Sequence, residues 1–335
     1  EQPGAGHWWE SSDEPGAECL DWAPMFDLFA HYRSVSDREV RSVRFVTMNP
    51  AISDRLAWVT IGSQVRPGEP STVSIECDPH AGRFKGTTTN VESLELSLAA
   101  LVGTPTSVEL DGDRIEVPKT AAKSLFLQRG GSAWELSSGP DLTNEVPNRS
   151  GPFKQAFNHR ALLVYGTHGS PAENAAMLAK ARFDSESFWY RGNGSFEVAS
   201  DEQCLSGEFE DRSIILYGNS NLNRAWAPLL GGSPVDVRSG AVQVGDRTYP
   251  GDALACLVIR PRHNDFGTSV AGIGGTGLAG LRLTERLPYF LSGVGYPDFC
   301  VFGPEVLSTG IEGVKAAGYF RNDWSLNPDD MVEPE

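Results

Sequence analysis

The first candidate for chemistry is a single histidine, His7, in the stretch 3–9 (PGAGHWW). Glycines before it allow a tight loop, and the tryptophans after it could shield the imidazole ring from water. A general base needs such a loop, because its ring must be reachable by a nucleophile and protected from bulk solvent. A histidine packed on aromatic side chains for structural reasons would have the same neighbours. His7 is therefore a candidate catalytic base, with a structural loop residue as the alternative.

The second candidate is a glycine pattern at 272–277 (GIGGTG), which fits the GxGxxG spacing through Gly272, Gly274 and Gly277. The pattern follows an expected strand at 268–273 and opens an expected helix at 277–290. In a dinucleotide site such glycines let the backbone approach a pyrophosphate at a helix N-terminus. In a glycine-rich chain the same pattern also makes a tight turn from strand to helix. A nucleotide-binding enzyme stays an alternative, and the favoured interpretation predicts no cofactor.

The third candidate is a polar cluster made by Arg260, Arg262, His263 and Asp265, which follows a buried strand. Ligand sites of open α/β sheets gather after such strands, so this cluster could bind an anionic ligand or a sugar. A solvated loop closed by an arginine–aspartate pair is the alternative.

Other residue patterns give no metal or disulfide site. The chain has five cysteines and neither a CxxC pair nor an HExxH motif, and its remaining histidines lack carboxylate or cysteine partners at ligand spacing. We therefore predict no metal and expect the cysteines to be buried thiols. The residues Asp111, Gly112 and Asp113 are expected to form a hairpin turn, and this interpretation is preferred to a calcium-binding loop.

Composition narrows the class of protein and its partners. The chain has 335 residues, and 44 acidic against 28 basic side chains give it a formal net charge of −16. This length fits about two domains, and this charge would repel a phosphate backbone, so nucleic acid is an unexpected partner. The longest unbroken apolar run, 253–259, is far shorter than the roughly 18 residues that span a bilayer, so we expect no membrane span. The composition is compatible with an exported or a cytoplasmic protein, and export is slightly favoured.

The elements that position these residues fall into parts with different periodicity. A short amphipathic helix is expected at 21–29. From about 40 to 140 the apolar pattern alternates with period two, and hairpins are expected at 111–112 and 130–131. This pattern predicts a β-sandwich. The proline-rich and polar stretch 141–158 is expected to be a linker.

Beyond the linker the pattern becomes strand then helix. The expected strands 161–166 and 214–219 both end in Tyr-Gly and are followed by a polar loop and a helix. The helix after the first strand begins with a capping box at 170–173 and runs to about 183. The aromatic run 188–191 is expected to be core beside a strand, with a carbohydrate or protein contact as the alternative. Strands that alternate with helices predict a parallel, doubly wound sheet of the Rossmann or flavodoxin type.

A family resemblance adds to this interpretation. Residues 1–33, from PGAGHWW through the 21–29 helix, resemble the C-terminal end of an α/β-hydrolase domain of the prolyl oligopeptidase type. In that family the triad histidine lies on the loop before the last helix, so the resemblance implies that His7 is the general base. The stretches 84–91 (FKGTTTNV), 188–195 (FWYRGNGS) and 214–219 (IILYGN) resemble the long C-terminal extension of some large bacterial hydrolase-like proteins.

The chain departs from the hydrolase pattern in one respect. The triad order in that fold is Ser, then Asp or Glu, then His, and a histidine at position 7 leaves no room for the other two. A GxSxG motif is also absent from the sequence. We therefore expect this chain to be a piece of a longer protein and to be inactive as a hydrolase alone.

These observations lead to one leading hypothesis and two alternatives. The expected parts are a hydrolase tail at 1–38, a β-sandwich at 39–140, the linker at 141–158 and an α/β domain at 159–330. The leading hypothesis is the C-terminal fragment of a serine peptidase or esterase that contributes the triad histidine, with a peptide or ester as substrate. The alternatives are a non-catalytic module that binds a ligand or partner and a nucleotide-binding enzyme.

Overall fold

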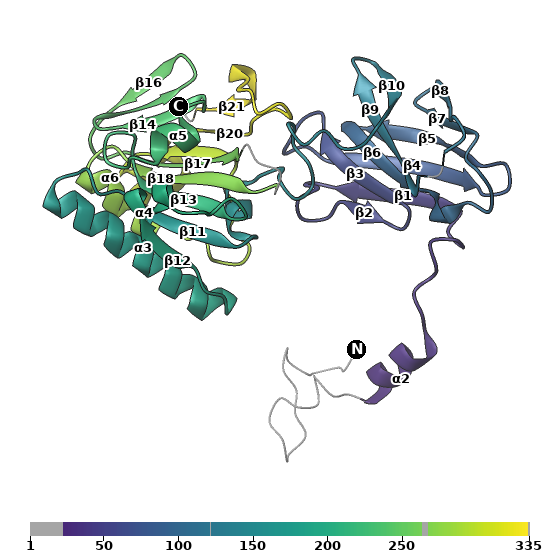
Figure 1. Ribbon diagram of the computed structural model, residues 1–335, viewed down its shortest axis with the longest axis horizontal. Coiled ribbons are helices and arrows are strands. Elements are labelled where there is room, and N and C mark those ends of the chain that lie inside the picture. The colour runs from purple at the N-terminus through teal and green to yellow at the C-terminus, as the bar shows by residue number, and fades with distance from the viewer. Residues whose placement is uncertain (1–22, 121, 263–266, 334–335) are drawn as a thin grey trace.

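The computed structural model describes residues 23–120, 122–262 and 267–333, which form a β-sandwich, a three-layer α/β domain and one separate helix (Figure 1). His7, His263 and Asp265 lie outside the described residues. None of the helices in the described ranges is both long and apolar enough to cross a membrane.

Two five-stranded sheets form the sandwich, and both expected hairpins are present. Alternate side chains of the strands point inward and form one core, in which the rings of Trp58 and Phe84 lie 5.2 Å apart. The first sheet has the order β1 (Ser42–Thr47), β4 (Ser71–Asp78), β5 (Arg83–Thr89), β7 (Ser107–Leu110), β8 (Asp113–Glu116). The second has the order β10 (Ala133–Ser137), β9 (Ser124–Gly130), β6 (Val91–Ser97), β3 (Val59–Gln64), β2 (Arg55–Leu56), and η1 (Leu98–Ala100) follows β6.

An eight-stranded sheet is the centre of the α/β domain. Its order is β12 (Glu197–Ser200), β11 (Ala161–Tyr165), β13 (Ser213–Gly218), β18 (Ser269–Gly275), β17 (Ala255–Pro261), β19 (Phe299–Phe302), β20 (Val314–Gly318), β21 (Met331–Val332). The two strands that end in Tyr-Gly are parallel neighbours, with Tyr165 opposite Tyr217.

The expectation of a wholly parallel sheet is wrong for half of the strands. Strands β12, β11, β13 and β18 are parallel, whereas β17, β19, β20 and β21 pair in antiparallel fashion. The physical reason is the short connection 262–268 between β17 and β18, since a parallel crossover needs a dozen or more residues. The sheet is therefore mixed.

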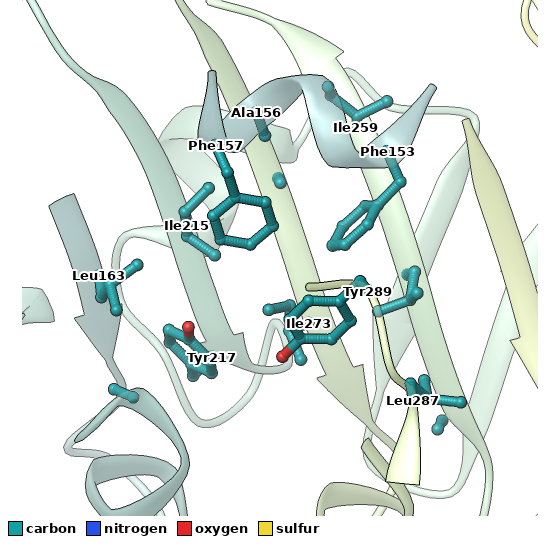
Figure 2. Close-up of a cluster of buried hydrophobic side chains, with 14 of the residues drawn as sticks. Phe153, Ala156, Phe157, Leu163, Ile215, Tyr217, Ile259, Ile273, Leu287 and Tyr289 are labelled. Carbon is teal, nitrogen blue, oxygen red and sulfur yellow. The ribbon is translucent and has the colours of Figure 1, made fainter. Parts of the chain in front are cut away.

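Both faces of this sheet are covered. One face packs under α3 (Pro171–Gly192), α6 (Leu278–Leu283), η2 (Phe153–Phe157) and η3 (Thr284–Arg286), and Figure 2 shows this core with Phe153, Phe157, Ile215 and Tyr289. The other face packs under α4 (Asp201–Ser206), α5 (Trp226–Leu230) and a small sheet of β14 (Val235–Arg238), β15 (Ala241–Val244) and β16 (Arg247–Pro250). The peripheral elements are α7 (Val306–Thr309), η4 (Gly310–Gly313) and η5 (Pro328–Asp330).

Helix α3 is longer than expected. It begins at the expected capping box, in which the amide of Ser170 donates to Glu173 Oε2 over 2.8 Å, but it continues past 183 to Gly192. The extra turns are stabilised by the Lys180–Asp184 ion pair and by stacking of Phe188 on Phe196 at 4.1 Å. The run 188–191 is thus the last turn of a helix, and Trp189 and Tyr190 are 67% and 81% exposed instead of buried.

The stretch 141–158 is packed and differs from the expected linker. Phe153 and Phe157 are buried in the core of the α/β domain, and Arg149 is buried with its guanidinium donating to the carbonyls of Leu142 and Arg262. The segment thus has fixed contacts where it runs between the two domains.

The expected N-terminal helix is present as α2 (Ala23–His31), and it stands apart from both domains (Figure 1). It has no buried residue, and Phe29 in its last turn is 63% exposed.

Candidate functional site

The polar cluster expected after β17 is described only through its two arginines, which lie on that strand and directly after it. Arg260 donates to the carbonyl oxygen of Trp324, and its guanidinium lies 4.8 Å from the ring centre of Phe320. Arg262 donates to the carbonyl oxygens of Phe209 and Arg212. Both guanidiniums thus bind backbone carbonyls of neighbouring segments.

The GxGxxG glycines have a packing explanation. Gly272 and Gly274 lie inside β18, not in the turn that follows it. A Cβ atom at Gly272 would lie 2.7 Å from the indole of Trp226, so the missing side chain lets the buried tryptophan approach the sheet. Only Gly277 lies at the start of α6. The described geometry therefore accounts for these glycines without a nucleotide.

A pocket of about 760 Å³ lies between the sandwich and the α/β domain. One wall is the outer face of the second sandwich sheet. Because side chains alternate along a strand, Thr60 of β3, Ser93 and Glu95 of β6, and Phe126 and Gln128 of β9 point away from the sandwich core and line this wall. The alternation of apolar and polar residues that predicted the sandwich thus also places polar side chains on this wall of the pocket.

The opposite wall comes from the segments 137–148 and 321–330, which belong to the connection and to the C-terminal part of the α/β domain. The amide of Glu145 donates to the carbonyl of Asn322 over 2.8 Å, which ties these two segments together. The side-chain amide of Asn322 donates to the carbonyl of Gln64 over 2.6 Å and so reaches the sandwich. Asn322 therefore connects all three parts of the pocket.

Two residues that line the pocket each have a buried side-chain oxygen that accepts no hydrogen bond from any described residue, Glu145 Oε1 and Asn322 Oδ1. Glu145 is only 4% exposed. Burial raises the pKa of Glu145 well above its ordinary value, the charge of Asp298 raises it further, and Arg260 opposes the change. A buried acceptor without a donor costs free energy, so these atoms require an explanation.

Asp298 is a second buried carboxylate near Glu145. Its Oδ2 accepts a hydrogen bond from the amide of Phe320 over 2.8 Å, and Gly151 makes room for it, since a Cβ there would lie 1.9 Å from Asp298 Oδ1. Burial raises the pKa of Asp298 to about 7, although the Phe320 amide and Arg260 act in the opposite direction. Burial in turn lowers the pKa of Arg260 to about 10, while Asp298, Asp323 and Glu145 raise it.

A pH prediction follows from Asp298. Because its folded pKa of about 7 lies above its ordinary value of 3.8, the folded protein holds this proton more tightly than the unfolded chain. The stability contributed by the protonated group is therefore present at low pH and is lost as pH rises from about 4 to about 7. We expect thermal melts across this range to show a larger decline for the wild type than for Asp298→Asn. A difference in melting temperature that stays constant with pH would contradict the assignment.

Sequence reasoning did not identify this pocket. Glu145 lies in a polar, proline-containing stretch that is typical of a linker, and nothing in its neighbours signals burial. The pocket also combines residues far apart in the chain, from Asp54 to Asp330. Across the residues that the structure describes, no group of three or more His, Cys, Asp or Glu is placed to hold a metal ion.

No protein-family model matches the chain. A protein of Arthroderma benhamiae described as an uncharacterized secreted protein is 24% identical to the chain over 347 residues. The alignment covers 98% of this chain and 35% of that protein, so the chain spans about a third of the length of this curated relative.

Proposed function

We propose that the sandwich and the α/β domain together form an accessory ligand-binding module, and that its binding site is the pocket between them. The observation that carries the proposal is the buried Glu145 carboxylate, whose Oε1 faces no donor among the described residues. A buried acceptor without a hydrogen bond lowers the stability of the folded protein, and a bound ligand that donates a hydrogen bond to it would remove this cost.

The size and position of the pocket support this proposal. Sites for small molecules have volumes of about 300–1,000 Å³ and often lie at domain interfaces. The pocket has about 760 Å³, and it combines the aromatic ring of Phe126 with polar side chains from both domains. A small polar molecule or a short peptide segment fits these dimensions.

Blocking the pocket tests the proposal. Gln128→Trp places an indole on the pocket wall, whereas Ser124→Trp places one on the same face of β9 outside the lining residues. The probes are amino acids, short peptides and small sugars, which are screened by thermal shift and titrated by calorimetry. We expect at least one probe to bind the wild type and the Ser124→Trp control, and to bind Gln128→Trp at least tenfold more weakly. If no probe binds, or if binding survives Gln128→Trp, the proposal fails.

A second candidate function is the leading sequence hypothesis, in which the chain ends a serine hydrolase and His7 is its general base. The apolar side chains of α2 favour it, because Phe26, Leu28 and Phe29 are all more than half exposed. An apolar helix face normally packs against a core. In this proposal α2 packs against the hydrolase domain, and the pocket module holds part of a peptide or ester substrate near it.

We also propose that the protein is exported. The support is the relative from Arthroderma benhamiae, which is described as secreted.

A further inference from the structure

The charge of the pocket between the domains indicates which ligand it binds. Seven acidic residues and two arginines line it. Besides Glu145, the acidic residues are Asp54, Glu92, Glu95, Asp141, Asp323 and Asp330. The surplus of negative charge makes the pocket attractive to a cation and repulsive to an anion.

The two arginines do not neutralise this surplus. Arg66 pairs with Glu69 at 3.5 Å, outside the lining residues, and Arg321 lies 3.7 Å from Asp330. Within the described ranges, no lysine or arginine forms an ion pair with Glu92, Glu95 or Glu145. Burial raises the pKa of Glu92 despite the nearby charge of Arg129, so this carboxylate is also poorly solvated.

The two oxygen atoms without partners indicate that the ligand carries hydrogen-bond donors. Glu145 Oε1 and Asn322 Oδ1 are acceptors, both are buried, and neither has a donor among the residues that the structure describes. A ligand that reaches these atoms must therefore bring N–H or O–H groups, and the acidic side chains that line the pocket favour one that is positively charged. Phe126, also on the wall, offers an aromatic face to such a group.

We propose that the pocket binds a guanidinium group, with the Glu145 carboxylate and the Asn322 amide oxygen as its acceptors and Phe126 as its aromatic contact. A guanidinium has five N–H donors in a planar fork that matches a carboxylate, and it is more weakly hydrated than an ammonium. A hard metal ion would instead need six or more oxygen ligands, and the described residues provide no metal-binding group. The inference rests on the proposed function and names the ligand class of that same pocket.

Calorimetry with matched probes tests the guanidinium assignment. The group could come from a free small molecule or from an arginine side chain of a polypeptide, so the probes are agmatine and the peptide acetyl-Gly-Arg-Gly-amide. The control is the same peptide with citrulline, which keeps the shape and removes the charge. We expect at least one guanidinium probe to bind at least tenfold more tightly than the citrulline peptide. Stronger binding of the peptide than of agmatine would identify a polypeptide source, and the reverse would identify a small molecule.

Glu145→Gln is the decisive variant. It keeps the shape of the side chain and removes the charge, so it should fold, and its melting temperature should equal or exceed that of the wild type because an unpaired buried acid is removed. We expect it to bind the guanidinium probe at least tenfold more weakly. The matched control Glu76→Gln, on the exposed side of β4 in the other sheet, should bind like the wild type.

The outcomes separate the two proposals. Binding of both agmatine and the arginine peptide no tighter than that of the citrulline peptide, or unchanged binding of the tighter guanidinium probe by Glu145→Gln, would overturn the guanidinium assignment. If those probes fail but another probe binds and is lost in Gln128→Trp, the pocket remains a binding site and only the ligand class is wrong. If no probe of any kind binds, both proposals fail.

Discussion

Replacing Lys180 by methionine is expected to lower the free energy of unfolding by about 3–5 kcal/mol, because it leaves a buried carboxylate without its cation. Lys180 and Asp184 are buried on α3, and their Nζ and Oδ1 atoms lie 2.6 Å apart. Asp184 Oδ2 also accepts hydrogen bonds from the hydroxyl groups of Tyr217 and Tyr289. The hydroxyl of Tyr289 in turn accepts a hydrogen bond from Lys180 over 2.5 Å. This closed network joins α3 to β13 and to the segment after η3, in the core that Figure 2 shows.

Chemical denaturation measures this loss. The control is Lys123→Met, which removes the charge of an exposed lysine and should change stability by less than about 0.5 kcal/mol. The double variant Lys180→Met with Asp184→Leu should regain part of the lost stability, because no lone charge is then buried. If Lys180→Met unfolds at the same denaturant concentration as the wild type, the buried pair contributes little and the network is wrongly assigned.

In the full-length protein that the gene encodes, His7→Ala is expected to reduce kcat/KM for an ester or peptide substrate by roughly 10³-fold or more, because a triad without its base loses most of its rate. The expectation follows from the resemblance of residues 1–33 to a hydrolase C-terminus. It assumes that the serine and the acid lie in sequence before Glu1.

The measurement is hydrolysis of activated esters and of proline-containing peptides by the purified full-length protein. His31→Ala is the matched control, since His31 is exposed on α2 and, among the residues that the structure describes, its Nδ1 bonds only the carbonyl of Asp27 in the same helix. Full activity of His7→Ala would show that His7 is a structural loop residue and would leave the binding module as the function of this chain.

Much of the fold could be predicted from the sequence, because turns and helix caps depend on residues that are neighbours in the chain. The hairpins at 111–112 and 130–131 follow from turn residues between alternating strands, and the start of α3 follows from its capping box. The repeated Tyr-Gly strand ends correctly identified two equivalent strands, which prove to be parallel neighbours in register.

Features that depend on tertiary contacts were not predicted. One local feature was missed as well: the antiparallel pairing of β17 with β18 follows from the short connection 262–268, whose length can be read from the sequence. Helix α3 continues through 188–191 because Asp184 and Phe188 find buried partners on other elements. The pocket is harder still to predict, since Glu145 becomes a buried acid only when the C-terminal segment around Asn322 covers it.

The central claim is that the pocket between the domains binds a guanidinium group, and crystal structures of the chain grown with agmatine and with acetyl-Gly-Arg-Gly-amide test it most directly. The account predicts difference density for at least one probe between the outer face of β9 and the 321–330 segment, with the guanidinium within hydrogen-bond distance of Glu145 and Asn322. A pocket that stays empty at saturating concentrations of both probes, or probe density on another surface of the molecule, would contradict it.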